Sequence, residues 1–221
     1  MIRLCIFDLD GTLIDSLQDL ANSCNAVLRE DGFPVHSLDA YRYFVGNGIP
    51  KLIERILPED KRTKERMADV QKRFDKYYQV HCLDATGPYP GIQELLTACR
   101  EEKILLSVLS NKAEPFAKLI CREIFGDGIF DAVCGQKPEV PKKPAPDGVF
   151  SLLRKFAIRP EQAILIGDSN VDILTAQNAG IHSIGACWGF RGRDELTEAG
   201  AEALANTPKD CQAIIFHKNW E

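Results

Sequence analysis

The stretch RLCIFDLDGT, residues 3–12, joins a short apolar run to two acidic residues and a glycine. The run at residues 3–7 lacks polar alternation, which is typical of a parallel strand that is buried on both faces. Asp8 and Asp10 follow two residues apart on a chain that is still extended, so both carboxylates project the same way. Gly11 then permits a sharp turn. The stretch predicts a strand that delivers two carboxylates to one edge of a sheet.

Strand-like and helix-like segments alternate along most of the remaining chain. Short apolar runs bounded by turn residues predict further strands at 104–109, 130–133, 163–166, 182–184 and 203–205. Amphipathic patterns predict helices at 92–101, 114–123, 147–156, 171–179 and 209–216. This alternation indicates an α/β fold with a sheet of about five or six strands.

Residues 16–83 interrupt the alternation. They hold helix-like repeats such as Leu17, Leu20 and Cys24 but no clear strand, which predicts a helical insertion. Residues 87–91 contain two prolines and two glycines and predict a stiff connector that could act as a hinge.

Composition excludes several classes of protein. The net charge is −5 with acidic and basic residues interleaved, so no basic stripe for nucleic acid is present. No apolar run is long enough for a signal segment or a membrane span. The eight cysteines are scattered without a Cys-x-x-Cys pair, which favours reduced, mostly buried thiols. We therefore expect a cytoplasmic protein with no nucleic-acid or membrane partner.

Three further motifs lie at or near the ends of predicted strands. Ser110 and Asn111 precede a helix, where a hydroxyl and free backbone N–H groups can bind a phosphate. Pro144 and Pro146 follow Lys143 and restrict the backbone around it, so that its ammonium can be held in one direction. Asp168 and Asp172 follow the strand at 163–166 and add carboxylates at the same sheet edge. Neighbouring carboxylates repel one another, and Mg²⁺ with its preference for oxygen ligands would neutralise them.

These four motifs, in this order and at strand ends, resemble the haloacid dehalogenase-like superfamily over the whole chain. The resemblance implies a Rossmann-like parallel-sheet core, residues 1–15 and 84–221, with a small α-helical cap, residues 16–83, inserted after the first strand. It also implies roles for individual residues: Asp8 as nucleophile, Asp10 as general acid and base, Ser110, Asn111 and Lys143 as phosphate binders, Asp8, Asp10 and Asp168 as Mg²⁺ ligands, and Thr12 and Asp172 as supporting residues.

The implied activity is a Mg²⁺-dependent phosphatase that passes through an aspartyl-phosphate. Lys143 and the metal would reduce the repulsion between an attacking carboxylate and a phosphate dianion. Asp10 would protonate the leaving alkoxide and then take a proton from the water that hydrolyses the intermediate. Dehalogenases of the superfamily lack the second aspartate, so the presence of Asp10 disfavours dehalogenation.

Within the superfamily, residues 32–34, 41–48 and 143–147 and the run at Asp168 resemble phosphoglycolate phosphatases, which implies that 2-phosphoglycolate is the substrate. The loop Gly46-Asn47-Gly48 could close over the site, and Arg42 or Lys51 could meet a substrate carboxylate. The alternative is a turn between helices with surface cations beside it. Residues 188–192 also resemble a family loop, and we interpret them as a structural loop.

Other substrates fit the same motifs. The alternatives are a pyrophosphatase, a sugar-phosphate or nucleotide phosphatase, a phosphomutase, and a non-catalytic phosphate-binding module. A nucleotide-cofactor protein would need Gly-x-Gly-x-x-Gly after the first strand, where Gly11 stands alone. In each case we expect a small phosphorylated metabolite as partner and a monomer or homodimer.

Overall fold

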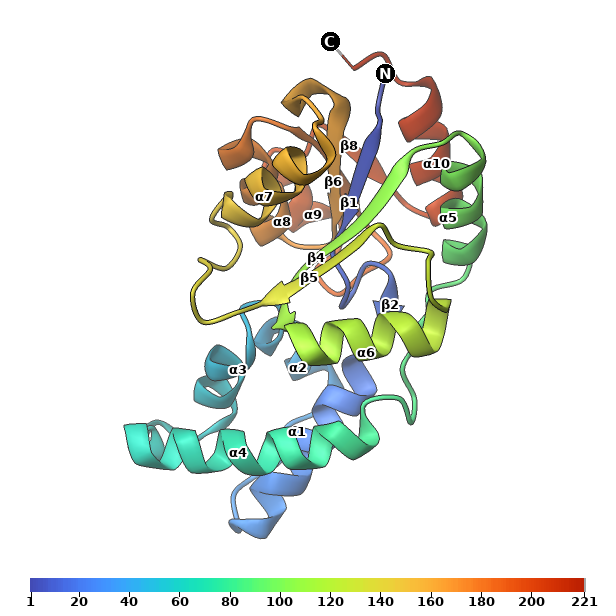
Figure 1. Cartoon of the computed structure of the whole chain (residues 1–221). Helices are drawn as coiled ribbons and strands as arrows, with labels where there is room; N and C mark the ends of the chain where they lie inside the picture. Colours follow the sequence, from blue (N-terminus) through green and yellow to red (C-terminus); the bar gives the residue numbers. More distant parts are fainter. Residues whose placement is uncertain (221) are drawn as a thin grey trace.

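In the computed structural model, which describes residues 1–220, β1 (Leu4–Phe7) lies inside a six-stranded parallel sheet (Figure 1). It pairs with β4 (Leu105–Ala113) on one side and β6 (Ala163–Gly167) on the other. The spatial order is β5-β4-β1-β6-β7-β8, with β5 at Ala132–Gln136, β7 at His182–Ala186 and β8 at Ala203–Ala205. The strand order thus reverses beside β1. Ligands of open parallel sheets bind at such a reversal, beyond the carboxyl ends of the strands.

Both faces of the sheet are apolar because helices cover both. Leu4 and Ile6 of β1 join one buried cluster, whereas Cys5 and Phe7 join the other. The first cluster includes α7 (Asp147–Phe156) and α8 (Asn170–Ala179), and the second includes α5 (Ile92–Glu101), α6 (Glu114–Phe125) and α10 (Pro208–His217). A short α9 (Arg193–Glu198) contacts β7 and β8, and a 3-10 turn, η2 (Pro160–Gln162), leads into β6. This arrangement confirms the predicted α/β fold.

A separate group of helices lies beyond the carboxyl ends of the strands, at the bottom of Figure 1. Its members are α1 (Leu17–Glu30), α2 (Leu38–Phe44), α3 (Ile49–Ile56), η1 (Glu59–Lys61) and α4 (Lys64–His81). The chain enters through β2 (Ile14–Asp15) and leaves through β3 (Gly87–Pro88), which pair antiparallel. The two crossings therefore lie side by side. We propose that this group is the expected cap and that residues 87–91 form its hinge.

Two of the predicted strands differ most in their bounds from the structure. The predicted end of the second strand at residue 109 was wrong, because β4 continues to Ala113, where it pairs with Gln136 after an irregularity in register. The prediction of a strand at 130–133 was also wrong in its bounds, because β5 lies at Ala132–Gln136. Phe130 packs edge-on against Phe125, and regular pairing of β5 begins only at Ala132.

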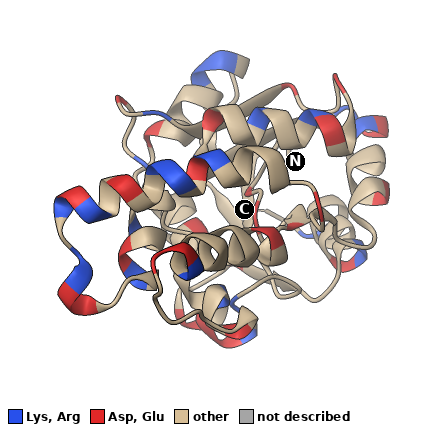
Figure 2. Ribbon diagram, turned by 90° about the horizontal axis from the view of Figure 1, so that it is seen from below, with Lys and Arg blue, Asp and Glu red and all other residues tan. Residues whose placement is uncertain are grey.

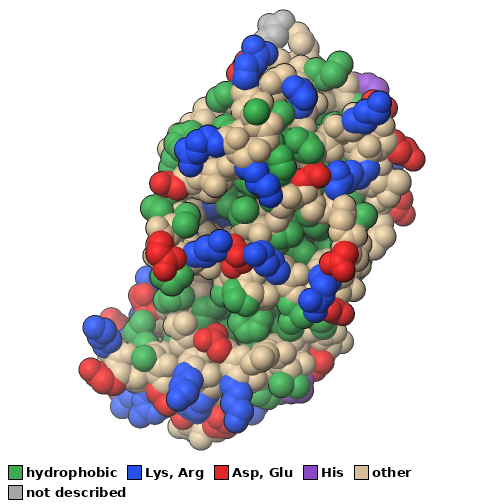
Figure 3. Space-filling view, in the orientation of Figure 1, with side chains coloured by type: hydrophobic (Ala, Val, Ile, Leu, Met, Phe, Trp, Pro, Cys, Tyr) green, Lys and Arg blue, Asp and Glu red, His purple; other side chains and the backbone are tan. Residues whose placement is uncertain are grey.

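The surface agrees with the charge pattern of the sequence. Acidic and basic residues are interspersed along the helices (Figure 2), and their side chains are interspersed over the face shown in Figure 3. Among residues 1–220, no helix combines the length and the apolar character that crossing a lipid bilayer requires. The eight cysteines are free thiols, six of them buried, as the sequence predicts.

Asp19 of α1 joins the helical group to the returning chain. It is buried, and its carboxylate accepts hydrogen bonds from the backbone N–H groups of Ala85 and Thr86 at 3.0 and 2.8 Å and from the Thr86 hydroxyl at 2.7 Å. A carboxylate that satisfies buried backbone donors contributes more than a neutral hydrogen bond does. The contact fixes α1 beside the proposed hinge.

Replacing Asp19 with alanine should lower the free energy of unfolding by about 2–4 kcal/mol, because two backbone donors lose their acceptor. Thr86→Val is the matched control. It removes only the hydroxyl donor and should cost about 1 kcal/mol. Urea denaturation measures both values, and an Asp19→Ala protein as stable as the wild type would contradict this account.

Candidate active site

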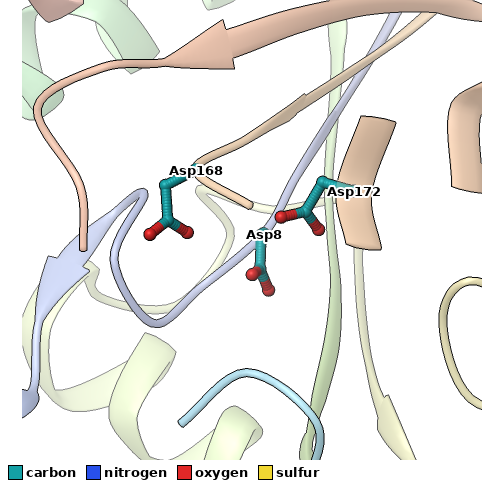
Figure 4. A group of neighbouring side chains, drawn as sticks. All are labelled: Asp8, Asp168 and Asp172. Carbon is teal, nitrogen blue, oxygen red and sulfur yellow. The ribbon is translucent and has the colours of Figure 1, made fainter. Parts of the chain in front are cut away.

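Three neighbouring strands deliver polar side chains to one edge of the sheet. Asp8 follows β1 directly, Asp168 follows β6 directly, and Ser110 lies near the end of β4. Lys143 reaches the same place from the loop between β5 and α7. Figure 4 shows Asp8, Asp168 and Asp172 close together, with Asp172 on the first turn of α8. The motifs predicted at strand ends therefore converge at the reversal of strand order.

Lys143 links two of these carboxylates. Its Nζ lies 2.9 Å from Asp8 Oδ1 and 2.5 Å from Asp172 Oδ1, and the side chain is buried. Burial opposes the charge, but the neighbouring charges of Asp172 and Asp8 outweigh it and hold the pKa of the ammonium above its usual value. Lys143 is therefore a fixed positive charge beside Asp8.

Asp8, Asp168 and Asp172 form an acidic group whose combined negative charge exceeds the single positive charge of Lys143. One oxygen each from Asp8, Asp168 and Asp172 lies within 4.8 Å of the others, and all three residues are buried. Burial, together with the charges of Asp172 and Asp10, raises the pKa of Asp8 to about 6 against the opposing effect of Lys143. Burial and the charges of Asp172 and Asp8 raise the pKa of Asp168 well above its usual value. Three carboxylates beside one ammonium fit a hard divalent cation with oxygen ligands.

Asp168 is held from two directions. Its Oδ1 accepts a hydrogen bond from the Thr12 hydroxyl at 3.3 Å, and its Oδ2 accepts one from the Phe190 backbone N–H at 2.8 Å. The backbone passes close to Asp168 at two glycines, Gly11, with φ +86°, and Gly189. A Cβ on either residue would lie under 2.5 Å from an atom of Asp168. Glycine is required at both positions because the backbone approaches so closely.

The loop at 188–192 therefore does more than connect β7 and α9. Besides the contact of Phe190 with Asp168, the indole N–H of Trp188 donates to the carbonyl oxygen of Thr12 at 2.9 Å. The interpretation as a plain structural loop missed this role. Its resemblance to a family loop was the one signal in the sequence.

Asp172 contacts both the start of α8 and Lys143. Oδ2 accepts hydrogen bonds from the backbone N–H and the hydroxyl of Ser169 at the start of α8, at 3.2 and 2.7 Å. Oδ1 faces the Lys143 ammonium. A single carboxylate therefore caps a helix and orients the lysine.

Asp10 points to a different set of partners. Its Oδ1 accepts hydrogen bonds from the Ser16 hydroxyl at 2.5 Å and from Lys112 Nζ at 3.0 Å. Its carboxylate is thus not part of the group formed by Asp8, Asp168 and Asp172, and the role of Asp10 as a Mg²⁺ ligand stays a prediction. Sequence reasoning did not select Lys112 as a site residue, although it directly follows Ser110 and Asn111 along the chain.

Asn111 connects the loop that carries Lys143, between β5 and α7, to the helical group. Its Oδ1 accepts from the Lys143 backbone N–H at 2.9 Å, and its Nδ2 donates to the carbonyl oxygens of Lys143 and Gly46, both at 3.1 Å. The side-chain amide is therefore occupied by backbone partners. The Ser110 hydroxyl accepts a backbone hydrogen bond from Lys112 at 3.3 Å.

A pocket lies between the sheet edge and the helical group. The core contributes Asp8, Asp10, Ser110, Asn111 and Lys112, and the helical group contributes Leu20, Val45, Gly46, Gly48, Ile49 and Leu52. One side is polar and the other is mainly apolar. The loop predicted to close over the site does border this pocket, through Gly46 and Gly48.

The remaining cap candidates lie around the pocket. The Asn47 carbonyl oxygen accepts from Lys142 Nζ at 2.7 Å. Arg42 Nε lies 3.6 Å from Asp39, and Lys51 Nζ lies 2.6 Å from Glu54; both cations are about two-fifths exposed, and neither lines the pocket. Contact of either with a substrate stays a prediction.

Comparison with known proteins places this fold and site in one class. Residues 5–186 match the family model of the haloacid dehalogenase-like hydrolases. The chain belongs to the haloacid dehalogenase-like hydrolase family, as its motifs predict.

Several individual proteins of this family are similar to the chain over most of its length. The chain is 34% identical to a phosphoglycolate phosphatase of Aquifex aeolicus, over 86% of each chain. The crystal structure of a "predicted phosphoglycolate phosphatase" from Haemophilus somnus matches with a TM-score of 0.90 and 27% identity, covering 96% of this chain and 97% of that one. CbbY from Rhodobacter sphaeroides, solved in complex with phosphate, matches with a TM-score of 0.79 and 25% identity, covering 94% and 95%.

The raised pKa values of Asp8 and Asp168 predict that protons and a divalent cation compete for the acidic group. A carboxyl whose folded pKa lies above its unfolded value binds extra protons in the folded state. Without the cation, its contribution to stability therefore falls as the pH rises from about 4 through about 6. Mg²⁺ should reverse this loss. We expect it to raise the melting temperature at pH 7.5, with an affinity that weakens roughly tenfold per pH unit below about 6 for each proton displaced.

Thermal unfolding at graded Mg²⁺ concentrations measures this effect. Asp168→Asn should abolish most of the stabilisation, whereas Asp127→Asn, on an exposed turn, should leave it intact. Equal stabilisation by Mg²⁺ in the wild type and in Asp168→Asn would place the cation elsewhere.

Proposed function

We propose that this protein is a Mg²⁺-dependent phosphatase that hydrolyses 2-phosphoglycolate through an aspartyl-phosphate on Asp8. The observation that carries the proposal is the position of Asp8, at the reversal of strand order, 2.9 Å from a buried lysine and beside two further carboxylates. Its direct opening onto the pocket supports a nucleophilic role.

Asp8 has the features that attack on phosphorus requires. One of its oxygens accepts the backbone N–H of Leu9 at 2.7 Å and contacts Lys143, which leaves the other for the substrate. Lys143 would stabilise the negative charge on the transferring phosphoryl oxygens, together with the hydroxyl of Ser110 at the pocket wall. Asp172 keeps the ammonium aimed at this point.

Asp10 is placed for proton transfer. It lines the same pocket two residues beyond Asp8, and Ser16 and Lys112 fix its orientation. We assign it the protonation of the leaving alkoxide and then the activation of the hydrolytic water, a contribution of roughly 100- to 10,000-fold. Residues 45–48 and α3 would exclude bulk water from the pocket during both steps.

Asp8 and Asp168 are the carboxylates that would hold Mg²⁺, with Asp172 at the side of Lys143. Bound there, the cation supplies charge neutralisation of the acidic group and of the phosphate oxygens. Thr12 and the Phe190 backbone N–H orient Asp168 for this role. The free, mostly buried thiols support action in a reducing compartment such as the cytoplasm.

The choice of 2-phosphoglycolate is supported by relatives that carry the name phosphoglycolate phosphatase and by the small, partly apolar pocket. A sugar bisphosphate is the second candidate. It is favoured by the similarity to CbbY, of which one mutant was solved in complex with xylulose-1,5-bisphosphate.

Phosphate release from a panel of substrates tests this function. The panel contains 2-phosphoglycolate, pyrophosphate, sugar mono- and bisphosphates and nucleotides, each with and without Mg²⁺. We expect Mg²⁺-dependent hydrolysis with the highest kcat/KM for 2-phosphoglycolate, and at least a roughly 1,000-fold loss in Asp8→Asn, which keeps the shape and removes the nucleophile.

Other results of the panel point to other functions. Preferred hydrolysis of a different ester would change the substrate and keep the mechanism, and phosphoryl transfer to a sugar without free phosphate would indicate a mutase. No turnover with any substrate would favour a binding module. Full activity in Asp8→Asn would refute the assigned nucleophile.

A further inference from the structure

Lys112 is a buried cation on the pocket wall to which the proposed mechanism gives no contact with the substrate. Its Nζ donates to Asp10 Oδ1 at 3.0 Å and to the Tyr78 hydroxyl at 2.7 Å, and 2% of its side chain is exposed. An ammonium has three N–H donors. Among residues 1–220, its acceptors are the Tyr78 hydroxyl and both oxygens of Asp10, the second at 3.2 Å, so a ligand in the pocket would share the ammonium with Asp10.

The rest of the pocket offers little to a second negative group on the substrate. Leu20, Val45, Ile49 and Leu52 form its apolar side. A carboxylate that loses its hydration against such a wall needs a cation or hydrogen-bond donors to replace the water. Lys143 is already shared by two carboxylates and the expected phosphate. Of the charged residues that line the pocket, Lys112 alone is positive.

The chemistry of the substrate matches this position. In 2-phosphoglycolate a single methylene separates the bridging ester oxygen from the carboxylate. Under the proposed function, on which this step rests, Asp10 lies at that ester oxygen. Lys112 contacts Asp10 and is therefore within reach of the carboxylate. We infer that Lys112 is the specificity-determining residue that binds the carboxylate of the substrate.

Tyr78 fixes the ammonium in this place. It comes from α4, is 1% exposed, stacks on Phe74 with ring centroids 5.3 Å apart, and meets Phe116 of α6 edge-on at 5.3 Å. The Lys112 ammonium also lies 4.7 Å from the centre of the Tyr78 ring. Lys112 is therefore held between the core and the helical group, whereas the cap cations Arg42 and Lys51 pair with carboxylates at the surface.

A pair of matched substrates separates carboxylate binding from effects on Asp10. The substrates are 2-phosphoglycolate and 2-phosphoglycolamide, in which a neutral amide replaces the carboxylate, and the readout is the ratio of their kcat/KM values. Lys112→Met should reduce this ratio about 30-fold, the effect of one lost charge-assisted hydrogen bond. Most of the change should be a higher KM for the substrate that carries the carboxylate. Lys118→Met, an exposed lysine paired with Glu114, is the matched control and should leave the ratio unchanged.

Three results would overturn the inference. An equal fall in kcat/KM for both substrates would mean that Lys112 acts only by positioning Asp10. A loss of preference in Lys51→Met but not in Lys112→Met would move carboxylate binding to the cap surface. A wild type with no preference for the carboxylate would refute the proposed substrate as well.

If Lys112→Met does not fold, the comparison of Lys112→Arg with Lys112→Gln replaces it. The arginine variant should keep most of the preference for the carboxylate and the glutamine variant should lose it. The same preference in both would contradict the inference.

Discussion

Lys143 lies buried between Asp8 and Asp172, and the fold tolerates the burial of these charges only because each has a partner. The contact draws together the end of β1, the loop before α7 and the first turn of α8. Removal of one partner would leave an uncompensated charge in a dry site, which costs several kcal/mol. The strands bring these residues to one edge of the sheet, and the attraction between their opposite charges orients the side chains there.

The same electrostatics explains why the acidic group suits a metal. One ammonium cannot balance Asp8, Asp168 and Asp172, and the raised pKa values of Asp8 and Asp168 express that imbalance. A protein can relieve it with protons or with a cation. A phosphatase gains from the second solution, because a site that binds a cation also tolerates the charge of a phosphate ester.

Much of this arrangement could be predicted from the sequence, since strands buried on both faces have a simple apolar signature. The bounds of α5 and α7 agree with the amphipathic pattern, and the strand-end positions of Asp8 and Asp168 follow from their neighbours. Contacts that depend on tertiary packing could not be predicted. Nothing local shows that Lys112 turns to Asp10 and Tyr78, or that the Phe190 backbone N–H reaches Asp168. These partners lie 22 to 102 residues apart in sequence, and only the folded chain brings them together.

The central claim is that Asp8 carries the phosphoryl group between the two half-reactions. Acid quenching during steady-state turnover, followed by borohydride reduction and peptide mass spectrometry, detects an acyl phosphate as a reduced side chain. The account predicts this modification at Asp8, with substrate and Mg²⁺ both present, and none at position 8 in Asp8→Asn. Modification of Asp10 or another residue in its place, or rapid phosphate release with no trapped residue under any quench time, would contradict it.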